Sequence, residues 1–373
     1  MITSRLAAYY ASSFMMLGIH LVFWPIWLSD HGLTPTDIGL LLALGIASKL
    51  IANPLIAHFA DSYGQRKKII ALLVLLSFFA FSLFPWAQSF AAILALHLVF
   101  LALWSPTMPL MESMVMHGVA NQGYDYGRIR LWGSVTFMIA AIGVGYLLKS
   151  RSTDLIYLAI ILTLGLTVIS AFSLPDIRPP KSNSKRFALL VVAQDKKFLL
   201  FLLGTALIQT SHAVYYGFGS IHWKNNHITE DWIGILWATG VLGEIVLFTY
   251  ASKVLKRIGP ARLIALAGVA GFIRWPLMGL TMDIFPLIGL QLLHAMTFGA
   301  THIGAMHYIQ SRIDPSLSAT AQSLYSGIVM GGAMSLATYF SGHLYNDYQG
   351  GAYFAMGAMA ATGGMIVFIL RRK

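Results

Sequence analysis

The stretch IGLLLALGIASKL, Ile38 to Leu50, indicates the class of fold to which this chain belongs. All but one of its residues suit the hydrocarbon interior of a lipid bilayer, and the exception is Lys49. A charged side chain at the centre of a bilayer costs roughly 2.5–3.5 kcal/mol on insertion scales. Because intramembrane charges usually line the path of a substrate or an ion, Lys49 predicts a functional site inside a membrane helix.

The composition of the whole chain agrees with a membrane location. Of its 373 residues, 57% are hydrophobic and 10% are charged, whereas soluble domains average about 25% charged residues. Long apolar runs recur throughout, and the strict alternation of a membrane β-barrel is absent. The chain has no cysteine, which excludes disulfide and thiolate chemistry. We expect an all-α integral membrane protein, and we interpret the first apolar run as a membrane helix and not a removable signal.

Twelve stretches are apolar and about 20 residues or longer, as a membrane-spanning helix requires. Their approximate limits are 6–28, 36–59, 69–87, 90–115, 130–148, 154–174, 197–222, 232–252, 261–281, 285–310, 316–344 and 350–370. The longest polar stretch, PDIRPPKSNSKR (Pro175 to Arg186), lies between the sixth and seventh. The predicted domains are therefore an N-terminal six-helix bundle (1–174), a cytoplasmic linker (175–196) and a C-terminal six-helix bundle (197–373).

The basic residues predict the orientation of these helices. If the N-terminus is cytoplasmic, 20 of the 25 basic residues fall on the inner side, and only Lys149, Arg151 and Lys224 fall outside. Lys49 and Arg274 lie within the membrane. This bias follows the positive-inside rule, so we expect both termini in the cytoplasm. It also explains the net charge of +11 without nucleic acid as a partner.

The two halves share a pattern of residues at a constant offset of 195. The matched pairs are Ile38 and Ile233, Gly39 and Gly234, Gly45 and Gly240, Lys49 and Glu244, and Gly64 and Gly259. Parallel six-helix repeats with a substrate site between them are typical of major facilitator transporters. Lys49 and Glu244 each lie near the bilayer midplane, in opposite halves, which predicts that both face a central cavity. The alternative is an ion pair with a purely structural role.

The loop AHFADSYGQRKK, Ala57 to Lys68, resembles the signature loop of the major facilitator superfamily. The residues that match its acidic, glycine and basic positions are Asp61, Gly64, Arg66 and Lys67. Ala57 and Ser62 stand where glycine and arginine are usual. Gly64 suits a tight turn, and we expect Asp61 to accept hydrogen bonds from a neighbouring helix N-terminus. The resemblance implies that this loop latches one conformation of the transport cycle. The alternative is an ordinary basic cytoplasmic loop.

Four further stretches together resemble the phenylpropionate permease branch of the superfamily. They are DYGRIRLWGS (Asp125 to Ser134), SHAVYYGFGSIHW (Ser211 to Trp223), IRWPLMG (Ile273 to Gly279) and LLHAMTFGATHIGAMHYI (Leu292 to Ile309). The resemblance covers essentially the whole chain. It implies a major facilitator fold of twelve transmembrane helices in two pseudo-symmetric bundles, a location in the bacterial inner membrane, and uptake of a small substrate driven by protons.

The chain is also similar to lactose permease-like symporters. Those carriers place a glutamate on the eighth helix, an arginine on the ninth and a histidine on the tenth. Glu244, Arg274 and one of His294, His302 or His307 occupy comparable helices. The glutamate and arginine that such carriers place on the fourth and fifth helices are matched by Glu112 and by Arg128 or Arg130, which the resemblance assigns to the conformational gate.

The intramembrane charges have specific expected roles. Arg274 offers a planar fork for a carboxylate, so it either binds a substrate acid or pairs with Glu244 on the adjacent helix. Glu244 can carry a proton, because burial and a nearby cation oppose each other in their effects on a carboxyl group. His302 and His294 are alternative proton carriers. For each of these residues a structural role in helix packing is the competing interpretation.

The seventh predicted helix carries a polar and aromatic group. Gln209, His212 and Tyr216 are spaced to share one helix face, whereas Tyr215 faces partly away from it. Their rings can stack on a substrate ring, and Trp237 is a further candidate for the cavity wall. The alternative is a cluster that only joins helices through hydrogen bonds.

These observations predict a secondary transporter, with substrate, protons and membrane lipid as partners and the proton gradient in place of a cofactor. The expected substrate is an aromatic monocarboxylate such as 3-phenylpropionate, and a sugar or nucleoside is the alternative. The direction of transport stays open. The chain has no phosphate-binding loop, no metal-ligand set and no nucleophile with a base, so neither ATP drive nor an intramembrane enzyme is predicted. Two pseudo-symmetric halves around buried opposite charges favour a carrier that works by alternating access over a channel. We expect the protein to be a monomer.

Overall fold

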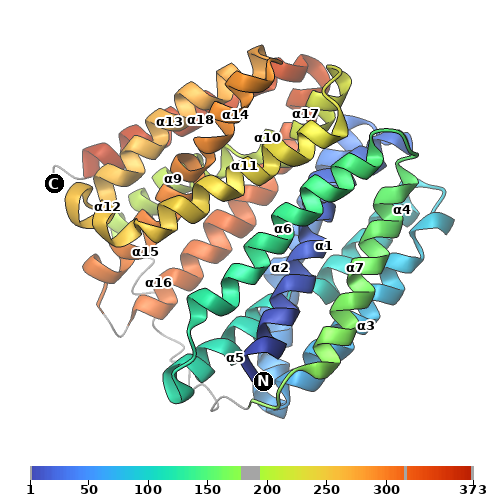
Figure 1. Ribbon diagram of the computed structural model, residues 1–373. Helices are drawn as coiled ribbons and strands as arrows, with labels where there is room; N and C mark the ends of the chain where they lie inside the picture. Colours follow the sequence, from blue (N-terminus) through green and yellow to red (C-terminus); the bar gives the residue numbers. More distant parts are fainter. Residues whose placement is uncertain (1, 178–193, 315–316, 371–373) are drawn as a thin grey trace. The chain divides into compact units, whose positions relative to one another are not determined.

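The computed structural model describes residues 2–177, 194–314 and 317–370, which form helices and no strand (Figure 1). Most of the predicted linker, 178–193, lies outside the described residues. The helices of the first half are α1 (Ile2–Asp30), α2 (Pro35–Tyr63), α3 (Arg66–Ser82), η1 (Phe84–Trp86), α4 (Phe90–Trp104), α5 (Thr107–Gln122), α6 (Tyr126–Leu148) and α7 (Asp154–Ser173). Those of the second half are α9 (Lys196–Thr210), α10 (Ala213–Asn225), α11 (Glu230–Thr249), α12 (Ala251–Ile258), α13 (Pro260–Leu280), α14 (Ile284–Leu292), η2 (Ala295–Ala300), α15 (Thr301–Arg312), α16 (Ser318–Tyr325), η4 (Ser326–Ala333), α17 (Met334–Tyr348), η5 (Gln349–Gly351) and α18 (Ala352–Leu370).

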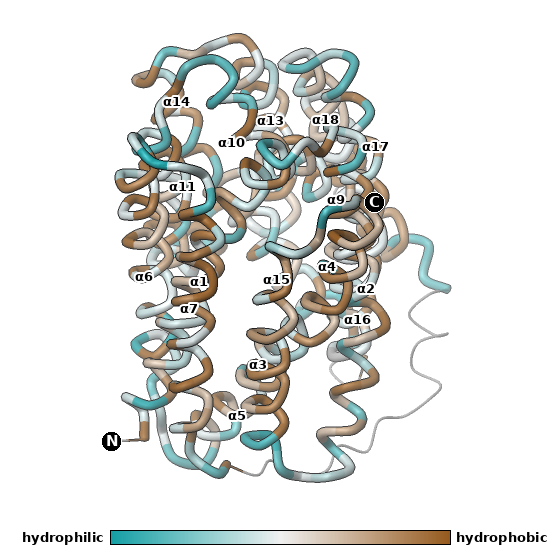
Figure 2. The backbone as a smooth tube through the Cα atoms, turned by 90° about the vertical axis from the view of Figure 1, so that its right-hand side faces the viewer, coloured by the Kyte–Doolittle hydropathy of each residue, from teal (hydrophilic) through white to brown (hydrophobic). Residues whose placement is uncertain are grey.

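The described residues contain 11 runs that are long and apolar enough to cross a membrane. Hydrophobic residues dominate these runs, and hydrophilic residues gather where the chain turns (Figure 2). The last run, Thr320–Leu370, has 51 residues and includes both the eleventh and the twelfth predicted spans. The short helix η5 divides it, beginning at Gln349, whose φ is 48°. The predicted all-α membrane fold is therefore confirmed, with two spans joined through a single helical turn.

The chain divides into two compact units. The N-terminal unit comprises the described residues of 1–33, 44–183 and 229–235, and the C-terminal unit those of 34–43, 184–228 and 236–373. The start of α2 thus belongs to the C-terminal unit, and the start of α11 belongs to the N-terminal unit.

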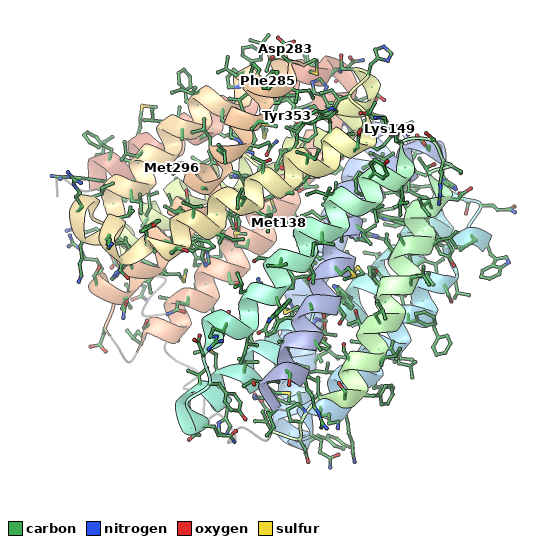
Figure 3. The ribbon with its side chains drawn as sticks, viewed as in Figure 1. Met138, Lys149, Asp283, Phe285, Met296 and Tyr353 are labelled. Carbon is green, nitrogen blue, oxygen red and sulfur yellow. The ribbon has the colours of Figure 1, made fainter. Side chains whose placement is uncertain are left out.

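In the N-terminal unit, α1 packs against α6 and α7, and α3 packs against α4 and α7 (Figure 1). Gly18 permits the close approach of α1 to α6, because a Cβ atom there would lie 2.6 Å from the carbonyl oxygen of Phe137. At the end of α6, Lys149 (labelled in Figure 3) donates to Asp231 over 3.1 Å. This pair joins α6 to the first turn of α11 within the same unit.

In the C-terminal unit, α18 packs against both α13 and α9. The crossing of α13 and α18 depends on glycine, because a Cβ atom on Gly268 would lie 2.6 Å from the Cα atom of Gly364. Real Cβ atoms do not approach so closely, so a side chain here requires the two helices to separate. This crossing positions Arg274, six residues further along α13.

We expect Gly268→Ala to destabilise the C-terminal unit, because close packing is lost along two of its central helices. The matched control is Gly289→Ala on α14, where a Cβ atom would meet nothing within 4 Å. Alanine at such an open helical position is neutral or stabilising by up to about 1 kcal/mol. The thermal unfolding midpoints of the two purified variants test this, and a Gly268→Ala midpoint equal to that of the control would contradict it.

Several predicted spans are interrupted where the sequence suggested continuous helices, and two of these interruptions lie beside Arg274 and its partners. The predicted span 197–222 breaks between α9 and α10, where the Ser211 hydroxyl donates to the Ile208 carbonyl and the His212 ring bonds the Gln209 carbonyl. Such side-chain bonds to the backbone compete with the helix and bend it. The predicted span 285–310 contains the π-helical turn η2. Turns of this kind are frequent at functional sites, because they change which residues share a face.

Candidate functional site

Arg274 is the centre of a buried polar cluster in the C-terminal unit. Its side chain is 0% exposed. One terminal nitrogen, Nη1, donates to the Thr297 hydroxyl over 2.8 Å and lies 3.1 Å from Nδ1 of His294. The other, Nη2, donates to Oε1 of Gln291 over 3.1 Å. We call Arg274, His294, Glu244, Thr297, Gln291, Tyr215 and His212 the Arg274 cluster.

His294 links Arg274 to the carboxylate of Glu244. A guanidinium only donates hydrogen bonds, so Nδ1 of His294 accepts from Arg274. The proton of a neutral ring then lies on Nε2, which is 2.9 Å from Oε1 of Glu244. His294 therefore connects the buried guanidinium of Arg274 to the partly buried carboxylate of Glu244 through hydrogen bonds, and the charges of Arg274 and Glu244 sum to zero.

A second chain of hydrogen bonds leads from Arg274 to α9. The Thr297 hydroxyl accepts from Arg274 and lies 3.1 Å from Nε2 of His212. Nδ1 of His212 is 2.9 Å from the Gln209 carbonyl, which only accepts, so Nδ1 carries the proton of a neutral ring. At the break between α9 and α10 this carbonyl accepts from both the backbone N–H and the ring of His212, and the turn η2 supplies Thr297. Both helix interruptions thus build the cluster.

Aromatic rings surround the Arg274 guanidinium. Its central carbon lies 4.4 Å from the Trp275 ring centroid and 5.1 Å from that of Tyr215, within the range of cation–π attraction. Tyr215 stacks on Trp237 at 4.3 Å, and its hydroxyl donates to Gln291 over 3.1 Å. Tyr353, labelled in Figure 3 at the start of α18, stacks on Trp275 at 6.2 Å. These faces suit the ring of an organic substrate.

Several polar atoms of this region are buried and lack a hydrogen-bond partner among the described residues. They are Nε of Arg274, Nε2 of Gln291, Oε1 of Gln209 and the Tyr353 hydroxyl. A buried polar atom without a partner costs free energy comparable to a lost hydrogen bond. Three of these atoms, Nε of Arg274, Nε2 of Gln291 and the Tyr353 hydroxyl, are donors that a carboxylate can satisfy. The described part of the chain contains no group of three or more histidine or acidic residues placed to hold a metal ion.

The geometry corrects three expectations about this cluster. Of the candidate histidines, His294 rather than His302 contacts both charged residues, and His302 stacks on Phe298 at 6.3 Å. Arg274 and Glu244 are joined through His294. Tyr215, expected to face partly away, is buried in the cluster.

The other predicted residues of this region lie close to the cluster. Gln209 donates weakly to the Tyr325 hydroxyl over 3.4 Å, and Tyr216 stacks on His212 at 5.5 Å. Trp237 donates from its ring nitrogen to Ser220 over 2.9 Å. Sequence reasoning missed Gln291, Thr297 and Trp275. An intramembrane glutamine is a usable signal, but a threonine or tryptophan on an apolar helix is not.

Lys49 lies in the N-terminal unit, in the middle of α2. It is close enough to His20 and His97 to interact electrostatically with both. The His97 ring is 0% exposed, and neither of its nitrogens has a hydrogen-bond partner among the described residues. Gly45 makes room for this ring, because a Cβ atom there would lie 2.6 Å from Nε2 of His97. Sequence reasoning missed both histidines. That Lys49 and Glu244 face a common cavity stays a prediction.

The signature loop contains the expected charge pair with different partners. Nη2 of Arg66 donates to Oδ1 of Asp61 over 2.6 Å, and Nη1 donates to Ser113 on α5. We expected Asp61 to accept from a helix N-terminus, but in the described residues its partner is the Arg66 side chain. Gly64 adopts a φ of 67°, which a side chain would strain. The loop therefore joins α2, α3 and α5.

The structure shows which of the two candidate arginines, Arg128 or Arg130, pairs with Glu112. Nε of Arg130 lies 3.7 Å from Oε1 of Glu112, so the pair is Glu112 and Arg130. The Arg130 guanidinium also lies 3.9 Å from the centroid of the Phe14 ring. Arg128 is exposed and contributes its backbone N–H to the Asp125 cap of α6. Arg128 thus has no part in this pair.

Comparison with known proteins gives the family. The sequence model of the MFS_1 like family matches residues 3–356. The chain belongs to this family. The "Probable 3-phenylpropionic acid transporter" of Escherichia coli (strain K12) is 32% identical over 368 residues, which are 96% of this chain and 95% of that one. The "Maltose permease" of Geobacillus stearothermophilus is 27% identical, over 98% of this chain and 93% of that one.

Solved structures show the same fold. The crystal structure of the nucleoside transporter NupG superposes with a TM-score of 0.85 at 16% identity, covering 100% of this chain and 98% of that one. The predicted superfamily, the fold and the branch resemblance are confirmed. The protein is a multi-pass membrane transporter of the major facilitator superfamily and not an enzyme.

Proposed function

We propose that the protein imports a small aromatic carboxylate, such as 3-phenylpropionate, together with a proton, by alternating access between its two halves. The observation that carries this proposal is Arg274, a fully buried guanidinium packed between aromatic rings and balanced by a single glutamate through His294. A cation suits the acid group of the substrate, and the rings suit its aromatic part. The relative from Escherichia coli, whose name includes 3-phenylpropionic acid, supports this substrate class.

The charges of the Arg274 cluster provide a reason for proton coupling. With Glu244 ionised the cluster is neutral, so an entering carboxylate leaves an unbalanced buried anion. At a separation of about 4 Å and an effective dielectric constant of about 20, two such anions repel by about 4 kcal/mol, or about a thousandfold in affinity. Protonation of Glu244 removes this repulsion. By linkage, bound substrate raises the affinity of Glu244 for its proton by the same factor by which protonation of Glu244 raises the affinity for the substrate.

The remaining expectations complete the proposal. The positive-inside bias supports a location in the bacterial inner membrane with both termini and the 175–196 linker in the cytoplasm. Asp61 with Arg66, and Glu112 with Arg130, act as gate contacts that hold one conformation of the transport cycle. The protein works as a monomer surrounded by lipid, uses the proton gradient and no cofactor, and does not bind nucleic acid.

A sugar or nucleoside symporter is the second candidate. The unpartnered amide atoms of Gln209 and Gln291 suit hydroxyl groups, which both donate and accept. Relatives named for maltose and nucleosides support this class. In this case Glu244 accepts from a substrate hydroxyl and still carries the proton.

A thermal-shift and uptake screen of the purified protein separates the two candidates. The compounds are 3-phenylpropionate, its uncharged amide, maltose and a nucleoside. The proposal expects strong stabilisation and saturable uptake with the acid, weaker binding of its amide, and no response to maltose or the nucleoside. Preference for maltose or the nucleoside would support the second candidate and reject the first. Counterflow of labelled substrate distinguishes a carrier from a channel, and uptake into everted vesicles would indicate an exporter.

The position of Lys49 gives a further prediction. If Lys49 helps to neutralise the substrate acid, Lys49→Ala weakens binding of 3-phenylpropionate far more than binding of its amide, by about tenfold or more. Lys49→Arg keeps the charge but changes its geometry, so it retains partial transport. Binding titrations with both ligands test this. Equal losses for acid and amide would show that Lys49 has only a structural role.

A further inference from the structure

An apolar groove of about 660 Å³ runs along the surface of α13 and α18 in the C-terminal unit. Its floor consists of small residues, Ala265, Ala361 and Gly364, because the two helices cross closely at this point. Its walls are large apolar side chains that are exposed, namely Leu266, Val269, Phe272, Met365 and Ile369. Exposed apolar surface on a membrane helix faces the lipid acyl chains, so the groove opens to the bilayer.

A smaller pocket of about 220 Å³ adjoins one end of this groove and shares Ile258 and Arg262 with it. Its lining adds Lys197 at the start of α9 and Arg312 at the end of α15. Neither Arg262 nor Arg312 forms an ion pair in the part of the chain that the structure describes. Two acidic residues lie near these basic ones in sequence, but neither lines the pocket. Asp195 caps α9 by accepting from two backbone N–H groups, and Asp314 follows Arg312 by two residues. The pocket therefore has excess positive charge.

The dimensions of the groove fit an acyl chain. From Arg262 to Phe272 the lining follows α13 for ten residues, or about 15 Å at 1.5 Å per residue. The hydrocarbon core of a bilayer is about 30 Å thick, so one leaflet supplies about half of this. The groove is thus long enough to hold the ordered part of one lipid chain, with the basic pocket at headgroup level.

We propose that the groove and the basic pocket together bind an anionic phospholipid, with an acyl chain against α13 and α18 and the phosphate among Lys197, Arg262 and Arg312. The occupant has to be apolar along its length and anionic at one end. A neutral lipid offers no counter-charge to Arg262 and Arg312, and a soluble anion leaves the groove empty. Basic pockets between membrane helices recognise anionic headgroups in this way.

The experiment is a titration of the purified protein in mixed micelles, with the thermal unfolding midpoint as the signal. The probes are dioleoyl phosphatidylglycerol, dioleoyl phosphatidylcholine and inorganic phosphate. The test variant is Arg262→Gln with Arg312→Gln. The control is Lys253→Gln with Lys256→Gln, which removes the same charge from exposed side chains of α12 outside the pocket.

The wild-type protein and the control are expected to be stabilised by phosphatidylglycerol in preference to phosphatidylcholine, and not by inorganic phosphate. Each arginine near an anionic surface is worth about a fivefold gain in affinity, so the test variant binds phosphatidylglycerol about 25-fold more weakly. Equal responses of the test variant and the control would overturn the proposal, as would a wild-type response that does not distinguish the two lipids. Stabilisation by phosphate alone would indicate a plain anion site. If the test variant fails to fold, the responses of the wild-type protein to phosphatidylglycerol, phosphatidylcholine and inorganic phosphate still test the proposal.

Discussion

Glu244→Gln is expected to abolish accumulation of substrate against a gradient while leaving exchange of substrate measurable. Glutamine keeps the side chain's size and its ability to bond His294, but it cannot release a proton. The cluster then carries a permanent positive charge, as it does when Glu244 is protonated. Substrate therefore binds at any pH between about 6 and 8, and its movement no longer depends on the proton gradient.

The measurement uses proteoliposomes with an imposed pH gradient and labelled 3-phenylpropionate. For one proton per substrate, a gradient of one pH unit supports about tenfold accumulation, because one pH unit corresponds to 1.36 kcal/mol. The wild type should approach this value and Glu244→Gln should stay near equilibration. Glu230→Gln, the same substitution in the first turn of the same helix, is the control and should accumulate normally. If Glu244→Gln still concentrates the acid, another group carries the proton.

Arg274→Gln is expected to cost both transport and stability. The substitution removes the cation that Glu244 balances and leaves a largely buried carboxylate without its counter-charge. The Thr297 and Gln291 oxygens also lose the hydrogen bonds that Arg274 donates. Breaking a buried ion pair by removing one partner typically costs about 3–5 kcal/mol. Transport should fall below detection, because the substrate acid also loses its proposed counter-charge.

The double variant Arg274→Gln with Glu244→Gln separates these two effects. Removal of both charges leaves no uncompensated ion, so much of the lost thermal stability should return. Transport should remain absent. Arg274→Lys is the conservative comparison, and it should retain stability better than transport because an ammonium lacks the planar fork. Additive losses of stability in the double variant would show that the two charges are not coupled.

The class of fold was predictable from hydropathy and charge because the bilayer imposes simple requirements on a helix. Each span needs about 20 apolar residues, and its loops carry the basic residues on one side. These requirements act on local sequence, so the predicted spans agree with the helices even where η5 joins the last two. The intramembrane charges were equally conspicuous, since Lys49, Glu244 and Arg274 stand out in apolar runs.

The contacts of those charges were not predictable, because they depend on the rotation of each helix about its axis. Two local departures from the α-helix decide this rotation: the break after Thr210 and the π-helical turn at 295–300. The break brings the His212 ring to the Gln209 carbonyl, and the turn places Thr297 beside Arg274. A periodicity of 3.6 residues carries no information about such departures. The sequence therefore could not single out His294 over His302 as the histidine that contacts both charged residues.

Hydropathy and charge therefore sufficed for the membrane class, the approximate spans and the identity of the residues most expensive to bury. Tertiary packing alone decided that His294 joins Glu244 to Arg274, that Arg130 rather than Arg128 pairs with Glu112, and that Tyr215 lies inside the cluster. The physical reason is the range of the interactions. Transfer into lipid depends on each side chain separately, whereas a hydrogen bond requires two atoms from different helices to meet within about 3 Å.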